Sequence, residues 1–151
     1  MDTDTFGNLD DWGKVLKTLE DLKKKKKLDK HQSGLARILR DGQNWRLLER
    51  VLEYGKEINQ PADEFLAEVT DIMANRNIYL DARILAAEVL DSLVPRRSTN
   101  SRNDGIFSKT LLIRKMVDIL NSSEPPIFHE LIANSLEVIK GKRQVEIPKE
   151  L

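Results

Sequence analysis

The sequence of 151 residues contains no cysteine. That absence excludes disulfide bonds, thiolate nucleophiles and the cysteine-ligated iron–sulfur and zinc sites. The chain has only seven glycines and five prolines, and aromatic residues make up 5% of it, which is unusual for a turn-rich sandwich or barrel. Leu, Lys, Glu, Asp and Arg are abundant instead, and they favour helices. A chain of this length is expected to form one domain with its own core.

Long apolar runs and an excess of one charge are also missing. No run approaches the roughly 18 apolar residues that a membrane span needs, and the start Met1-Asp2-Thr3-Asp4 is acidic, unlike a secretory signal. We therefore expect a cytoplasmic protein without a membrane span, with the nucleus as the alternative. The 25 basic and 25 acidic residues balance, so any attraction to nucleic acid or to a membrane surface must be local.

Apolar residues recur at spacings of three and four along most of the chain, which is the period of a helix. Trp12 and Trp45, for example, each start such an apolar series with leucines. Seven helical patterns joined mostly by short turns predict an all-α fold of antiparallel helix pairs. The predicted parts are an N-terminal helix at 9–28, helix pairs at 30–58, 61–94 and 107–140, a basic loop at 95–106 and an extended or frayed tail at 141–151.

The segment 79–94 is apolar over most of its circumference, so we expect it to be the most buried helix. On a helical wheel Asp81, Glu88 and Ser92 share one stripe, and Asp91 lies beside it. Arg83 falls nearly opposite, among apolar positions. It must be paired or reach the helix end, because an unpaired buried charge costs several kcal/mol or more.

The string from Asp81 to Leu93 resembles the second helix of a HEAT repeat, where Asp, Arg, paired alanines and two leucines recur at these spacings. A fainter copy lies 46 residues later, with His129 at the position of Arg83. The resemblance implies a short HEAT-like or armadillo-like α-α superhelix in a single helical-repeat domain. It also implies that Asp81 and Arg83 link neighbouring repeats in a structural ladder, while the alanines let helices approach closely.

Residues that could carry catalysis or bind a metal are scattered. His31 and His129 are the only histidines, and neither stands in a metal-binding motif. Adjacent carboxylates such as Asp10 and Asp11 diverge by about 100° on a helix, and the glycines form no phosphate-binding loop. We therefore expect a protein that is not an enzyme, with no cofactor and no metal.

The leading hypothesis is a scaffold or adaptor that binds another protein through its acidic stripe. The stripe has matching positions on the last predicted helix, and the predicted partner-binding residues are Asp81, Glu88, Asp91, Glu130, Asn134 and Glu137. Self-association of the chain into a homo-oligomer is compatible with this hypothesis.

The alternative is a small subunit that binds nucleic acid or another acidic surface. Two basic segments support it: Lys23 to Lys27, whose five lysines sweep more than one helical turn, and Arg96 to Lys115. The latter segment has only Asp104 against its six basic residues, which are Arg96, Arg97, Arg102, Lys109, Arg114 and Lys115.

Overall fold

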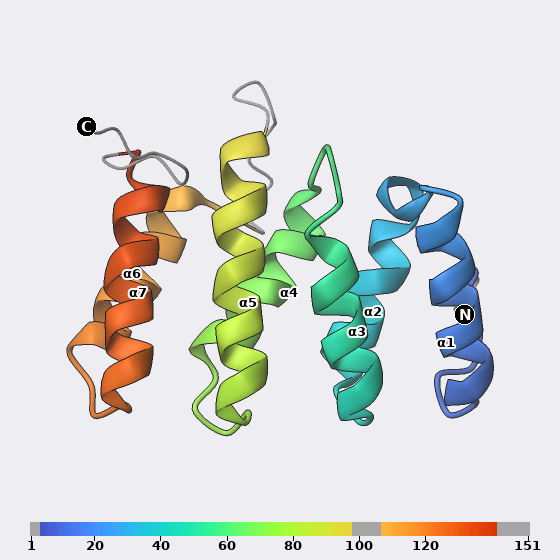
Figure 1. Ribbon diagram of the computed structural model, residues 1–151, viewed down its shortest axis with the longest axis horizontal. Coiled ribbons are helices and arrows are strands. Elements are labelled where there is room, and N and C mark those ends of the chain that lie inside the picture. Colours follow the sequence, from blue (N-terminus) through green and yellow to red (C-terminus); the bar gives the residue numbers. More distant parts are fainter. Residues whose placement is uncertain (1–3, 98–106, 142–151) are drawn as a thin grey trace.

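The computed structural model describes residues 4–97 and 107–141, and within these ranges it contains seven α-helices and no strand (Figure 1). The all-α fold with about seven helices, predicted from the sequence, is confirmed. Arg102, most of the predicted basic loop and all but Gly141 of the predicted tail lie outside the described residues. The helices are α1 (Trp12–Lys24), α2 (Gln32–Asp41), α3 (Trp45–Gly55), α4 (Asp63–Ala74), α5 (Leu80–Leu93), α6 (Lys109–Leu120) and α7 (Pro126–Ile139), with 3₁₀ turns η1 (Leu28–His31) and η2 (Val94–Arg96).

The helices lie in two layers. In one layer α1, α3, α5 and α7 run side by side in the same direction, and α2, α4 and α6 run the opposite way in the other (Figure 1). The turns that join α2 to α3, α4 to α5 and α6 to α7 therefore meet at one edge, the lower edge of Figure 1. The connections through η1, from α3 to α4 and through η2 lie at the opposite edge.

Local sequence signals account for several helix ends. The side chain of Asn44 accepts hydrogen bonds from the amides of Arg46 and Leu47 and so caps α3, and Ser108 caps α6 in the same way. Gly42 ends α2 with a φ of 60°, a left-handed conformation that costs glycine little. Pro126 is the first residue of α7, where its missing N–H is not needed.

Helix α5 lies at the centre of the core, packed against α3, α4 and α7. Ala82, Ala86 and Ala87 are fully buried, and their small side chains let the neighbouring helices come close. Arg83 is also buried: its Nε donates to the carbonyl of Met73 at 2.9 Å, and its two terminal nitrogens donate to Glu124 at 3.0 Å. The prediction that this arginine must be paired is confirmed.

His129 holds the same place in α7 that Arg83 holds in α5, the fourth residue of the helix. Its Nε2 lies 3.0 Å from the carbonyl oxygen of Ile119 and 2.9 Å from that of Ser122. Both side chains thus contact a carbonyl ten residues earlier, at the end of the preceding helix. The resemblance to HEAT repeats itself stays a prediction.

Candidate functional site

Large apolar side chains are exposed mainly at one edge of the molecule. Six are exposed among the described residues, and two of them, Leu111 and Val117, lie along α6. The other four stand at the starts of α1, α3, α5 and α7, which meet at the lower edge of Figure 1. We call these four the aromatic edge: Trp12 (51% exposed), Trp45 (55%), Tyr79 (41%) and Ile127 (65%).

Their position in the helix explains this exposure. Side chains of a helix lean toward its N-terminus, so a residue in the first turn projects past the helix end. Trp12 and Trp45 are first residues of their helices, and Tyr79 is the N-terminal cap of α5. The sequence pattern placed both tryptophans on apolar helix faces, yet about half of each is in solvent. Their nearness to a helix start is the signal that periodicity alone missed.

Trp45 and Tyr79, at the starts of the neighbouring helices α3 and α5, pair with each other. Their ring centres lie 6.5 Å apart with planes at 87°, an edge-to-face contact. The hydroxyl of Tyr79 donates to Glu49, and burial together with this carboxylate raises the pKa of Tyr79, so the hydroxyl stays a donor at neutral pH. Arg46 lies over the ring of Trp45, 5.4 Å from its centre. The pair is therefore fixed in orientation while remaining exposed.

A hollow of about 460 Å³ opens beside this pair, between the α2–α3 turn and the end of α4. Its ionisable lining residues are Arg40, Glu68 and Asp71, and Arg40 donates to Glu68 at 2.8 Å and to Glu64 at 3.3 Å. The remaining lining combines apolar side chains with amides, namely Leu39, Leu48, Ile72, Ile78, Gln43, Asn75 and Asn77, with Gly42 and the two rings.

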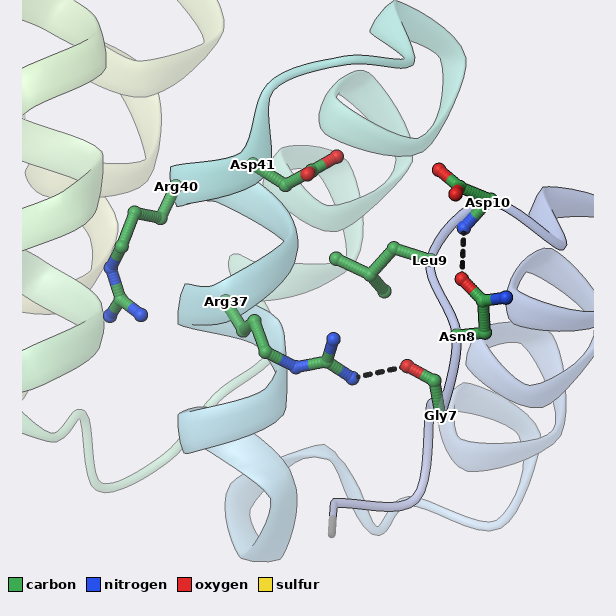
Figure 2. A pocket seen from close by; sticks show the side chains of 7 residues that line it. All are labelled: Gly7, Asn8, Leu9, Asp10, Arg37, Arg40 and Asp41. Atoms are coloured by element: carbon green, nitrogen blue, oxygen red, sulfur yellow. Dashed lines mark hydrogen bonds between the residues drawn. The ribbon is translucent and has the colours of Figure 1, made fainter. Parts of the chain in front are cut away.

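A second hollow, of about 690 Å³, lies where the segment before α1 crosses α2 (Figure 2). Arg37 donates to both carboxylate oxygens of Asp4 at 2.7 Å and to the carbonyl of Gly7 at 2.7 Å, which holds this segment and lowers the pKa of Asp4. In Figure 2 the carboxylates of Asp10 and Asp41 face one another across the hollow, while Arg40 points away toward α4.

These hollows form a series along the α2, α4 and α6 layer, because neighbouring hollows share lining residues. Arg40 lines both hollows described above. Asp71 lines the one beside Trp45 and a smaller one next to Phe107, and Lys115 lines that one and a further hollow at the α6–α7 turn. Of these hollows, the one beside Trp45 and Tyr79 is lined by residues of the aromatic edge.

The residues of the predicted acidic stripe differ in their contacts and exposure. Glu88 pairs with Lys56 of α3 at 3.0 Å, and Asp91 accepts a hydrogen bond from Ser135 of α7 at 3.0 Å. Burial raises the pKa of Asp91 to about 6. The other four stripe residues are more open: Asp81, Glu130 and Asn134 are exposed and Glu137 is half-buried. Binding of a partner to this stripe stays a prediction.

The two residues of the predicted HEAT-like ladder have different surroundings. Arg83 joins α5 to the α6–α7 turn through Glu124, while Asp81 is exposed at the start of α5. The ladder role implied for both residues stays a prediction.

Two arginines of the predicted basic site hold the fold together. Arg96 donates from Nη1 to the carbonyls of Lys56 and Ile58. Arg97 forms two hydrogen bonds with Asp63 and lies over the ring of Phe107, 5.1 Å from its centre.

The other basic residues are spread over two places. Lys109 and Arg114 are exposed on α6 and Lys115 is half-buried there. Lys23 pairs with Glu57 at 3.1 Å and lies over Tyr54, and residues 24–27 are exposed at the edge opposite the aromatic edge. The structure thus does not bring the predicted basic residues into one patch within the described ranges.

Comparison with family models, with curated proteins and with solved structures gives no match for this chain. Among the described residues, no group of three or more His, Asp or Glu side chains is arranged to hold a metal ion. None of the described helices has both the length and the apolar character that crossing a membrane requires.

Proposed function

We propose that the protein is a non-catalytic adaptor that binds another protein through the aromatic edge. The observation that carries this proposal concerns the six large apolar side chains that are exposed in the described part of the chain: four of them stand at one edge, at the starts of four parallel helices. Exposed apolar side chains gathered in one region mark interaction surfaces, and Trp and Tyr often dominate the binding energy there.

The proposed architecture is a short HEAT-like stack in which each helix pair adds one position to the edge. The two-layer arrangement and the equivalent contacts of Arg83 and His129 support it. A partner would then contact several pairs at once, as is usual for helical-repeat proteins. The absence of cysteine favours a cytoplasmic or nuclear adaptor.

Affinity capture from an extract of the source organism tests this proposal against the nucleic-acid alternative. The baits are the wild type, the double variant Trp45→Ser/Tyr79→Ser and a matched control at the opposite edge, Lys24→Ser/Lys25→Ser. Each is used at about 0.1 M and about 0.5 M salt, because phosphate contacts weaken steeply with salt.

We expect the wild type and the lysine control to retain the same protein at both salt concentrations, and the double variant to lose it. Retention of that protein by the double variant would overturn the proposal. Recovery of nucleic acid alone, lost at high salt and with the lysine variant, would favour the alternative.

A further inference from the structure

We propose that the hollow beside Trp45 and Tyr79 receives an arginine or lysine side chain from an apolar segment of the partner protein. This inference rests on the proposed function and adds the chemistry of the bound segment. The shape of the hollow is the first argument for it. Its volume of about 460 Å³ lies within the range of ligand pockets, roughly 300–1,000 Å³, and its apolar lining suits the methylene groups of a long side chain.

The charge of the lining is the second argument. Arg40 is the only cationic side chain among the described lining residues, and its charge is matched by Glu64 and Glu68. Asp71 lines the hollow from the exposed surface of α4 and adds a further negative charge. Complementary charge therefore favours a cation in the hollow and disfavours a phosphate group.

The third argument is that two arginines of the chain already use this chemistry. Arg83 lies over Phe128, 4.5 Å from the ring centre, with its guanidinium on Glu124. Arg97 lies over Phe107 with its guanidinium on Asp63. Each combines a cation–π contact with a charge-assisted hydrogen bond.

The hollow offers the same two elements, the rings of Trp45 and Tyr79 and the carboxylate of Asp71. In this case the cationic side chain comes from the partner. Flanking apolar residues of the same segment would contact the exposed parts of the two rings, which are the largest apolar surfaces at this place on the edge.

Selection from a phage-displayed library of random twelve-residue peptides tests the inference. Peptides are selected on the intact wild-type chain after depletion on Trp45→Ser/Tyr79→Ser, so that only binders dependent on the rings remain. Their affinities for the intact wild-type chain and for each variant are then measured by isothermal titration calorimetry.

We expect the selected peptides to share an arginine or lysine beside an apolar residue. Their affinity should fall at least tenfold on Asp71→Lys and about threefold on Asp71→Asn, and it should not change on the control Asp21→Asn, an exposed carboxylate near the other end of α1. Exchanging the basic residue of a peptide for Glu should weaken binding at least tenfold. Urea unfolding of each variant confirms that it is folded.

Selected peptides without a basic residue, affinities equal on wild type and Asp71→Lys, or no enrichment at all would each overturn the inference. The capture experiment separates this failure from that of the proposed function. A protein lost with the two rings but unaffected by Asp71→Lys would leave the adaptor standing and remove only the cationic side chain.

Discussion

Arg83 and Glu124 form an almost fully buried ion pair, with 4% and 5% of their side chains exposed. The arginine comes from α5 and the carboxylate from the α6–α7 turn, 41 residues later. Arg76 also approaches the same carboxylate, at 3.6 Å, but 62% of its side chain is exposed. The two arginines therefore offer a matched comparison of a buried and an exposed partner.

Glu124→Ala should lower the free energy of unfolding by about 3–5 kcal/mol, because it leaves the guanidinium of Arg83 buried without its carboxylate. Arg76→Ala should cost less than about 1 kcal/mol, since exposed ion pairs contribute little. Urea unfolding at pH 7 measures both. Equal small losses in the two variants would mean that the buried pair does not hold the α6–α7 turn.

The contribution of Asp91 to stability changes with pH. Burial raises its pKa to about 6, above the value of about 3.9 in an unfolded chain, against the lowering effect of the Ser135 hydrogen bond. The folded protein therefore binds this proton more tightly, and stability from this group is lost as the pH rises from about 4 to about 6. Among the described residues, its Oδ1 is buried without a hydrogen-bond partner.

Asp91→Asn should consequently raise the free energy of unfolding by about 1–2 kcal/mol at pH 7.5, where the wild-type carboxylate is charged. At pH 4 the two proteins should differ by much less. Urea unfolding at the two pH values gives the comparison, with the exposed Asp21→Asn as the control. A variant less stable than wild type at pH 7.5 would contradict the account of Asp91.

The sequence predicted that Arg83 needs a hydrogen-bonding partner, but it did not identify Glu124 as that partner. Periodicity tells which side of a helix is buried, so a charged residue on that side demands pairing. Which carboxylate pairs with Arg83 depends on the tertiary packing of the α6–α7 turn, 41 residues later in the chain. The same limit applies to Arg96 and Arg97. The sequence predicted that both belong to a basic surface, whereas in the structure they bind the turn before α4 and the first residue of α4.

At the scale of elements, helix number and most helix ends followed from local signals. The breaks at Gly42 and Pro126 and the cap at Asn44 are properties of a few neighbouring residues, so sequence alone carries them. The exposure of Trp12 and Trp45 depends instead on where a helix starts relative to its neighbours.

Gln32 ties the start of α2 to the turn between α3 and α4. Its amide nitrogen donates to the carbonyls of Asp29 at 3.1 Å and Gln60 at 2.9 Å, and its oxygen accepts from the amide of Ala62 at 2.6 Å. The side chain is buried, so its three hydrogen bonds replace bonds to water. The turn is thus held by a side chain about 30 residues earlier in the sequence.

Gln32→Ala should lower the free energy of unfolding by about 2–3 kcal/mol and speed hydrogen exchange of the Ala62 amide. Gln43→Ala, in the exposed turn after α2, serves as the control and should change neither quantity appreciably. Hydrogen exchange followed by NMR reports on the single amide. Unchanged protection of Ala62 in Gln32→Ala would show that the turn does not depend on this clamp.

On the scale of the whole molecule, the two edges differ in chemistry. The aromatic edge exposes large apolar side chains with the hollow beside Trp45 and Tyr79, whereas the opposite edge exposes the lysines at 24–27 and Arg96. The sequence predicted interaction sites on the acidic stripe, which lies on α5 and α7, and on the two basic segments. It did not predict the aromatic edge, because that edge appears only when four helices start side by side.

Trp45→Ser/Tyr79→Ser should lower the free energy of unfolding by no more than about 2 kcal/mol, since both side chains are exposed and the contact between the two rings lies at the surface. Phe65→Ala, at a fully buried position, should cost about 3–5 kcal/mol in the same urea titration. A loss in the double variant as large as that of Phe65→Ala would mean that the two rings serve the fold rather than a partner.

Site-specific photo-cross-linking tests the central claim most directly. A photoreactive benzoylphenylalanine replaces either Tyr79 on the aromatic edge or Lys24 on the opposite edge, and each protein is irradiated in an extract of the source organism. We predict a discrete adduct with one protein from position 79 and none from position 24. Adducts formed equally from both positions, or only from position 24, would contradict the assignment of the aromatic edge as the binding surface.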